Sequence, residues 1–257
     1  MRVVIQDGRR RDDARACIDV DDPGLARGVN VFETLRTHGR RLHHLPLHLQ
    51  RLADSAAALR IPMPPAEVLV AEVEAAAAEI DGEAVVRVTL TAGGTRIVHA
   101  RDLPPAPDRV RVATRPAPAH PWLSGRVKHG SRAVSVAAVA DAGTDEVFWV
   151  DGAGMLLEGT WSNIFAVVDG ALWTPPDDGR ILPGITRHML LQTAEELGVP
   201  IRLDPLPAAG PFDELYLSSS LKLLCPVVEL DGRPAAGSGP VGRRVASKLH
   251  RRYQRPA

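Results

Sequence analysis

The sequence contains very little cysteine and very little lysine. Its 257 residues include two cysteines, Cys17 and Cys225, which lie far apart and without the spacing of metal ligands. This pattern predicts a reduced, cytoplasmic protein and not a disulfide-stabilised secreted one. The three lysines are Lys128, Lys222 and Lys248, and all other residues in the total of 31 lysines and arginines are arginines. A lysine in so arginine-rich a sequence is a candidate for amine chemistry, which a guanidinium group cannot perform.

Long hydrophobic runs and an excess of one charge are absent as well. No segment approaches the length of a membrane-spanning helix, and the N-terminal residues lack the apolar core of a signal peptide. The formal net charge is zero and the pI is about 7.1, so we expect neither nucleic acid nor an anionic membrane as a partner. The length allows one large domain or two modest ones.

Hydrophobic periodicity predicts a chain rich in strands with interspersed helices. The predicted strands cover residues 2–6, 31–37, 84–91, 109–114, 147–150, 155–157, 163–168, 171–174, 215–217 and 227–230. The predicted helices cover residues 46–59, 66–80, 131–140, 184–197 and 241–253. Proline is dense over 116–124, which predicts a linker between an N-terminal domain (1–115) and a C-terminal domain (125–257). Hairpins mixed with helices in each half indicate a mixed α/β (α+β) fold and argue against a Rossmann sheet.

Two residues stand out as candidates for covalent and acid–base chemistry. Lys128 follows the linker and precedes a helix; it is either a surface lysine or an amine that forms a Schiff base, for which burial or a neighbour must lower its pKa. Glu158 lies in LLEGTWSNIF between two strand segments. It is either an edge-strand residue or a buried carboxylate that pairs with a cationic ring nitrogen.

Several other segments have the chemistry of an anion site. The segment ILPGITRHML leads into a helix, so the amides of Ile185 and Thr186 could bind an anion, although Thr186 is equally well explained as a cap. The hydroxyls of Ser218–Ser220 could line a phosphate or form an ordinary turn, and Arg51 could clamp a phosphate or lie in solvent. A metal site is not expected, because Pro46 interrupts the histidines at 43–48 and no acidic or cysteine partner is near.

Six segments, in this order and spacing, resemble the class IV (fold-type IV) pyridoxal-phosphate enzymes, which include branched-chain and D-amino-acid aminotransferases and aminodeoxychorismate lyase. The resemblance runs from about residue 24 to residue 244. Its anchors are GVNVFETLR (28–36), HLQRLADSA (48–56), VKHGSR (127–132), DEVFWVDGAGMLLEGTWSNIF (145–165), ILPGITR (181–187) and DELYLSSSLKLLCPVVELDGR (213–233).

This resemblance implies a role for most of the candidate residues. Lys128 looks like the lysine that carries pyridoxal 5'-phosphate as a Schiff base, and Glu158 looks like the partner of the pyridine nitrogen. Asn163 falls in the strand beside the ring. The residues that fall where the family binds the cofactor phosphate are Arg51, Ile185, Thr186, Ser219 and Ser220. The family places the cofactor between two domains and usually completes each site with a second subunit, which implies a homodimer.

The resemblance leaves the reaction open between two members of the family. We expect a transaminase that moves an amino group between a small amino acid, D-amino acids included, or an amine and a 2-keto acid. Arg96 and His99 resemble the substrate-carboxylate residues of D-amino-acid aminotransferases, with a spacing that differs by one residue. Arg27, just before Gly28, could reach a carboxylate from the partner subunit.

The alternative is 4-amino-4-deoxychorismate lyase, which releases pyruvate and 4-aminobenzoate. Thr34, the pair Lys128-His129 followed by Arg132, and the run SSSL at 218–221 resemble lyase sequences. Asn30 stands where the common GDGVFET motif has glycine, so the shape of the substrate pocket is not given by the motif. A scaffold without activity is a third interpretation, and the presence of Lys128, Glu158 and the phosphate set argues against it.

Overall fold

A computed structural model describes residues 1–118 and 122–254 of the chain. The chain forms two compact units. The first comprises Met1–Pro105 together with Val127–Ser131, and the second comprises Ala106–Arg126 together with Arg132–Ala257. None of the helices in the described part of the chain combines the length and the hydrophobicity that crossing a lipid bilayer requires.

The compact units do not coincide with the predicted domains 1–115 and 125–257. Strand β7 (Val110–Pro116) pairs with β15 (Leu223–Leu230) and β8 (Glu146–Val150) in parallel, and these hydrogen bonds make it part of the second unit. Of the predicted linker, residues 119–121 lie outside the described residues.

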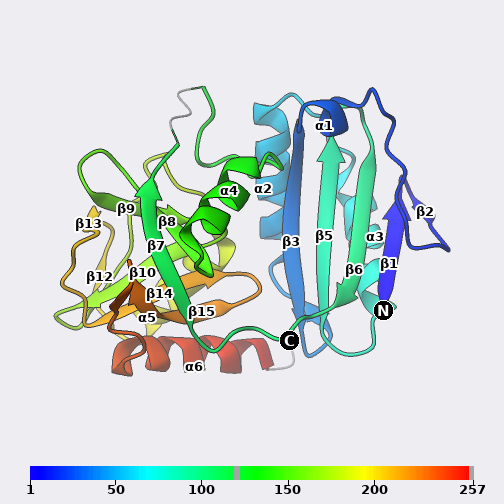
Figure 1. The fold of residues 1–257 in the computed structure, drawn as a ribbon. Coiled ribbons are helices and arrows are strands. Elements are labelled where there is room, and N and C mark those ends of the chain that lie inside the picture. The colour runs from blue at the N-terminus through cyan, green and yellow to red at the C-terminus, as the bar shows by residue number, and fades with distance from the viewer. Residues whose placement is uncertain (119–121, 255–257) are drawn as a thin grey trace. The chain divides into compact units, whose positions relative to one another are not determined.

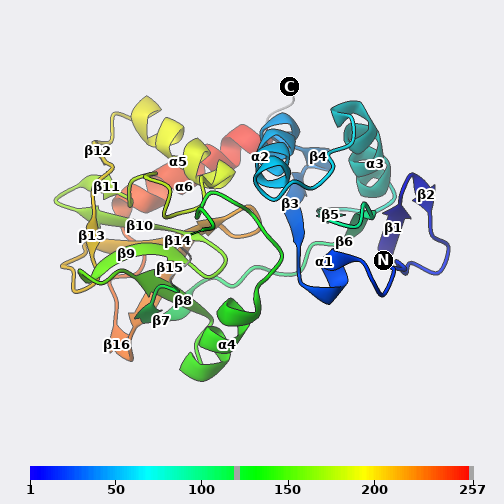
Figure 2. The same ribbon diagram turned by 90° about the horizontal axis from the view of Figure 1, so that it is seen from above.

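The first unit is an antiparallel sheet covered on one face by helices. Its strand order is β2-β1-β6-β5-β3-β4. The strands are β1 (Arg2–Gln6), β2 (Arg9–Arg10), β3 (Asn30–His38), β4 (Arg41–Leu42), β5 (Ala84–Thr91) and β6 (Arg96–Asp102). The helices are α1 (Pro23–Ala26), α2 (Leu45–Ala58) and α3 (Ala66–Ala78). Helices α2 and α3 lie on the same side of the sheet (Figure 1, Figure 2).

Side-chain alternation explains the core of the first unit. Alternate strand residues such as Val31, Leu35, Val86 and Val98 are fully buried in one apolar cluster with the Leu and Ala stripes of α2 and α3. The residues between them in sequence point to the opposite face of the sheet. That second face carries polar side chains, among them Thr34, Arg87 and His99.

The second unit contains a closed barrel. Antiparallel and parallel pairs connect β7, β8, β9, β10, β14 and β15 in a ring, and the ring closes where Glu158 of β9 pairs with Asn163 of β10. The strands are β7, β8, β9 (Met155–Gly159), β10 (Asn163–Val168), β11 (Ala171–Trp173), β12 (Ile201–Arg202), β13 (Leu206–Pro207), β14 (Glu214–Ser219), β15 and β16 (Arg233–Pro234). The helices are α4 (Ala133–Ala142), α5 (Ile185–Glu196) and α6 (Pro240–Gln254).

The barrel strands bury both of their faces. Phe148, Ile164 and Leu217 belong to the cluster that fills the barrel. Phe165 and Tyr216, which follow Ile164 and precede Leu217 in sequence, pair with each other and pack outward in the cluster formed with α5 and α6. Figure 2 shows α5 and α6 on one side of these strands and α4 on the other.

Every strand and helix predicted from periodicity has a counterpart in the structure, so those predictions are confirmed. Strand β6 was not predicted, although it is central to the first sheet. Its sequence RIVHARD mixes three charged residues and a histidine with few apolar ones, so it lacks the alternation that identified the other strands.

Candidate functional site

Lys128 is held by backbone hydrogen bonds on both sides. Its carbonyl accepts a hydrogen bond from the amide of Phe32 on β3 (3.1 Å), and its amide donates to the Ser55 hydroxyl on α2 (3.0 Å). The amide of Gly130 donates to the carbonyl of Asn30 (2.8 Å). Residues Val127–Ser131 therefore lie along β3 as part of the first unit, although they follow β7 in sequence.

Asn30 and Gly130 are complementary in shape. A Cβ atom on Gly130 would lie 1.8 Å from Oδ1 of Asn30, so a larger residue could take the place of this glycine only if the Asn30 side chain moved. The asparagine that departs from the common family motif therefore fills the space beside the lysine segment.

The amine of Lys128 lies on the sheet face that points away from α2 and α3. Its Nζ atom is 4.8 Å from the centre of the Phe32 ring. On the same face, cross-strand pairing places Thr34, Arg87 and His99 in one row over β3, β5 and β6. The guanidinium of Arg87 lies 3.6 Å from the centre of the Phe32 ring, so Phe32 is a shared neighbour of both cations.

Arg96, the predicted substrate residue, lies on the other face of the sheet. Its Nε and Nη2 atoms each donate to a carboxylate oxygen of Glu72 on α3, both at 2.8 Å. His99, three residues further along the same strand, has the opposite orientation because side chains alternate. Arg87 was not among the residues predicted from the sequence. A charged residue within the otherwise apolar strand AVVRVTLT could have identified it as a candidate.

Burial and neighbouring cations lower the pKa of His99. Desolvation is the largest cause, and the positive charges of Arg87, Arg101 and Arg2 act in the same direction. His99 is therefore neutral at pH 7, and Arg87 supplies the positive charge of the row. The other predicted substrate residues of this unit are Thr34, which is half-buried in the row, and Arg27, which is exposed at the end of α1.

Arg51, the predicted phosphate residue of the first unit, is buried and forms a forked ion pair. Its Nε and Nη2 atoms donate to the two carboxylate oxygens of Glu33, at 2.7 and 2.8 Å. Nδ1 of His48 is 2.7 Å from Oε2 of Glu33. Burial by itself raises the pKa of Glu33, but the charge of Arg51 and the hydrogen bonds of His48 and Arg51 outweigh it and bring the pKa to about 2.

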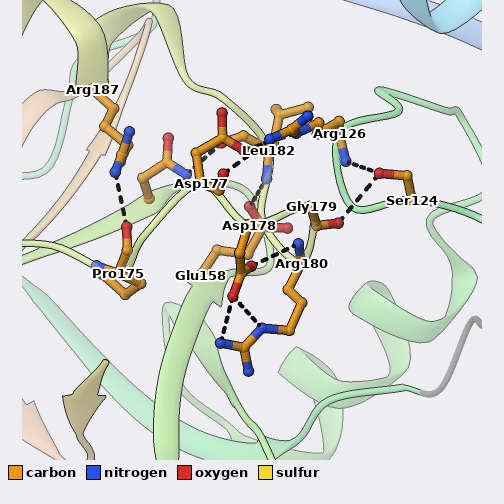
Figure 3. A network of polar contacts seen from close by, with 11 residues as sticks. Ser124, Arg126, Glu158, Pro175, Asp177, Asp178, Gly179, Arg180, Leu182 and Arg187 are labelled. Carbon is orange, nitrogen blue, oxygen red and sulfur yellow. Dashed lines mark hydrogen bonds and ion pairs between the residues drawn. The ribbon is translucent and has the colours of Figure 1, made fainter. Parts of the chain in front are cut away.

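In the second unit, Glu158 and Asn163 hold the backbone of one residue, Leu182, on both sides. The Glu158 carboxylate accepts a hydrogen bond from the amide of Leu182 (2.8 Å), and the side-chain amide of Asn163 donates to the carbonyl of the same residue (2.8 Å). Figure 3 shows Glu158 and Leu182 beside ion pairs that fix the loop, including that of Arg126 with Asp177. The loop leads directly into α5.

A bulge in β9 determines which way Glu158 points. Val150 pairs with Leu156 and Phe148 pairs with Gly159, so β9 has one more residue than β8 between these two pairs. Strict alternation from Leu156 would direct Glu158 into the apolar barrel. The extra residue turns it to the outer face, where it lies opposite Asn163.

Helix α5 begins without a side-chain cap. Its N-cap residue is Gly184, and a Cβ atom there would lie 1.9 Å from Oδ1 of Asn163, so no capping side chain fits. Ile185 and Thr186 form the buried first turn. Backbone amides at such a helix start, together with the helix dipole, favour an anion.

The serine run contributes a buried hydroxyl, Ser218, which the family resemblance did not include among the phosphate residues. The Ser218 Oγ atom is buried and has no hydrogen-bond partner among the described residues. Ser218 pairs with Asn163 in register, so its side chain shares the outer face of the barrel with Asn163. Of the two predicted serines, Ser219 accepts a hydrogen bond from the amide of Lys222 (3.3 Å) and Ser220 is half-buried in the following turn.

A buried carboxylate supports the turn that follows Glu158. Glu146 is fully buried and accepts hydrogen bonds from the Trp161 amide (2.9 Å) and the Ser162 hydroxyl (2.5 Å). Its other oxygen pairs with Nζ of Lys222 (3.2 Å). A Cβ atom on Gly159 would lie 2.5 Å from this carboxylate, so the glycine is required by the close approach of Glu146.

Arg132, the remaining predicted substrate residue, contacts the same turn. Its guanidinium donates to the carbonyl of Thr160 and lies 4.9 Å from the centre of the Trp161 ring. Burial lowers the pKa of Arg132, and the charges of Glu158 and Glu146 oppose this shift.

Comparison with known proteins identifies the family. Residues 30–230 match the family described as amino-transferase class IV. The chain belongs to the class IV aminotransferases. A candidate branched-chain-amino-acid aminotransferase of Methanocaldococcus jannaschii is 32% identical, over 98% of this chain and 95% of that protein. The bifunctional aminodeoxychorismate lyase / D-amino acid transaminase of Mycobacterium tuberculosis is 31% identical, over 90% of this chain and 92% of that protein.

A solved structure has the same fold. The pyridoxal-phosphate-bound form of a hypothetical aminotransferase from Mycobacterium tuberculosis superposes with a TM-score of 0.88 at 28% identity, over 98% of each chain. The predicted fold-type IV architecture is therefore confirmed.

The family works with pyridoxal phosphate, and the residues of this aminotransferase fit that cofactor. The chain is a pyridoxal-phosphate-dependent transaminase. It offers a primary amine at Lys128, a carboxylate at Glu158 and an uncapped helix start at Ile185 and Thr186. The buried Ser218 hydroxyl adds a donor that has no partner within the described chain.

The ion pair of Glu146 gives a stability prediction. We expect Glu146→Ala to lower the free energy of unfolding by about 3–5 kcal/mol, because it leaves the Trp161 amide and the Ser162 hydroxyl without their acceptor and Lys222 without its ion-pair partner. The matched change Glu196→Ala, which removes surface pairs with Lys248 and Arg252, should cost less than about 1 kcal/mol. Urea denaturation measures both, and equal losses would contradict this account.

Proposed function

We propose that this transaminase moves an amino group between a small amino acid, D-amino acids included, and a 2-keto acid, with the amine of Lys128 as the catalytic group. The observation that carries the proposal is the position of Lys128 Nζ. It lies beside Phe32 on the face that carries the row of Thr34, Arg87 and His99. An amine and a fixed cation on one face suit a substrate that has both a reacting carbon and a carboxylate.

Lys128 would serve as both anchor and base. When bound, pyridoxal phosphate supplies an aldehyde carbon and an electron-withdrawing ring, which make the Cα–H bond of an amino acid acidic. Nζ of Lys128 would attach the cofactor at rest, accept the proton from Cα during turnover and return a proton to Cα in the reverse direction. The two backbone hydrogen bonds of Lys128 keep its Cα atom fixed while its long side chain moves.

The second unit would hold the ring nitrogen and the phosphate. Glu158 would keep a proton on the pyridine nitrogen, and the shared hydrogen bonds to Leu182 would keep Glu158 and Asn163 in register. The amides of Ile185 and Thr186 would bind phosphate oxygens at the start of α5. Ser219 and Ser220 would donate hydroxyl groups to the same phosphate. Arg51 remains a predicted phosphate residue, with a guanidinium that suits phosphate oxygens.

Arg87 would bind the substrate carboxylate. It lies in register with Thr34 and His99, and among the residues of β1, β3, β5 and β6 that share its face there is no carboxylate. Arg96 is paired with Glu72 on the opposite face, so Arg87 is the better candidate. Arg27 and Arg132 remain predicted substrate residues. A small or D-amino donor is supported by the name of the D-alanine aminotransferase of Bacillus licheniformis, which is 27% identical.

The lysine assignment predicts a site of covalent attachment. Borohydride reduction of the holoenzyme should add the phosphopyridoxyl mass to the peptide that contains Lys128. Lys128→Arg should lower amino transfer from D-alanine to 2-oxoglutarate by at least about 100-fold, because a guanidinium stays protonated at pH 7 and cannot accept the proton from Cα. Lys248→Arg is the control, since either residue can pair with Glu196. Labelling elsewhere would refute the assignment, and release of 4-aminobenzoate from aminodeoxychorismate without amino transfer would assign the lyase.

If Arg87 binds the substrate carboxylate, changes of Arg87 and of Arg96 should affect substrate binding differently, because the two arginines lie on opposite faces of the sheet. Arg87→Gln should raise KM for D-alanine by roughly 10- to 100-fold, because a charge-assisted hydrogen bond to the substrate is lost. Arg96→Gln should leave KM unchanged. Steady-state kinetics measures KM for both variants. A higher KM in Arg96→Gln with an unchanged KM in Arg87→Gln would show that Arg96 binds the substrate.

We also propose that two copies of the chain associate. Nearly all of α4 is apolar in sequence, yet Ser135 is its one buried residue, and Val134, Val136 and Trp161 are exposed. Apolar groups gathered on one helix favour cover by another chain. Light scattering should give the mass of a dimer, and Val136→Asp should give a monomer. A wild-type monomer at micromolar concentration would exclude the association.

A further inference from the structure

Glu33 and His48 form a buried polar cluster with Arg51. Neither Glu33 nor His48 has a role in the function proposed above. Glu33 is 0% exposed, and His48 and Arg51 are 3% and 8% exposed. Glu33 lies in the middle of β3, on the face that contacts α2, and the other two residues lie one turn apart on α2. Replacing a buried ion pair by apolar residues is often neutral for stability, so stability alone does not account for this cluster.

The fork between Glu33 and Arg51 fixes the guanidinium plane. Two parallel hydrogen bonds of 2.7 and 2.8 Å join Nε and Nη2 to the two carboxylate oxygens. A guanidinium is rigid and planar, so engagement of this edge sets the direction of its other edge, between Nη1 and Nη2. A single hydrogen bond would leave the group free to rotate about the contact.

His48 holds Glu33 from the other side. A carboxylate can only accept, so Nδ1 of His48 donates to Oε2 of Glu33. Burial lowers the pKa of His48, and the nearby charges of Arg51 and Lys128 lower it further, against the opposing effect of Glu33. His48 is therefore neutral, and the cluster contains one positive and one negative charge.

We propose that Glu33 and His48 are positioning residues that hold the Arg51 guanidinium in the orientation in which it binds the cofactor phosphate. This inference rests on the phosphate role proposed for Arg51. Because the guanidinium is already fixed, phosphate binding does not have to order a long side chain. Glu33 and His48 thereby determine how strongly the protein distinguishes a phosphorylated cofactor from its unphosphorylated form.

The test compares pyridoxal phosphate with pyridoxal, which has the same ring and aldehyde but no phosphate. Equilibrium dialysis of the reconstituted protein gives Kd for each. Glu33→Gln should raise Kd for pyridoxal phosphate by about tenfold and leave Kd for pyridoxal unchanged, since ordering one long side chain costs about this much affinity. An unchanged Kd for pyridoxal phosphate, or equal losses for both ligands, would overturn the proposal.

Glu72→Gln is a matched control. Glu72 on α3 accepts two hydrogen bonds from Arg96 on β6, as Glu33 does from Arg51, and this change removes its carboxylate as well. Glu72→Gln should leave both Kd values unchanged, which separates the orientation of Arg51 from general loosening of the first unit.

A second pair of variants keeps the proposal testable if Glu33→Gln does not fold. His48→Ala removes the donor to Glu33, whereas His48→Asn offers an amide near the position of Nδ1. We expect His48→Ala to weaken pyridoxal phosphate binding selectively and His48→Asn to restore it. Equal effects of the two variants would contradict the inference. Wild-type protein that binds pyridoxal as tightly as pyridoxal phosphate would instead refute the phosphate role of Arg51 itself.

Discussion

One extra residue in β9 is the constraint on which the second half of the site depends. It turns Glu158 out of the apolar barrel and sets it opposite Asn163, at the one pair that closes the ring of strands. These two side chains bind the N–H and the C=O of Leu182, two residues before the glycine at which α5 begins. The Glu158 carboxylate and the uncapped start of α5 are thus placed by the same local irregularity.

In each of the two units a buried carboxylate acts as a clamp, that is, it fixes the position of a neighbouring candidate site residue or turn. Glu33 orients an arginine of α2, and Glu146 supports the turn between Glu158 and Asn163. Both are fully buried, and each is satisfied by a cation and additional donors. A buried charge requires this full set of partners, so each clamp has one geometry and transmits it to its neighbours.

Periodicity predicted the strands and helices well because most of them bury one apolar face, as in Ala84–Thr91 and Ile185–Glu196. It could not predict β6, whose sequence is mostly polar, and the orientation of Arg96 was missed with it. Motifs directed attention to Lys128, Glu158 and the start of α5. They could not identify Glu33 or Glu146 as clamps, because their partners lie up to 76 residues away and depend on strand register and on the β9 bulge.

The segment Val127–Ser131 makes the first unit discontinuous in sequence. The chain leaves this unit after Pro105, builds β7 in the second unit, returns to lay five residues along β3, and leaves again. A recombination event with a single crossover between the units would therefore separate Lys128 from Phe32 and Ser55, which hold its backbone. The two halves cannot be exchanged between relatives as independent modules, and the lysine is inherited with one half while its anchors are inherited with the other.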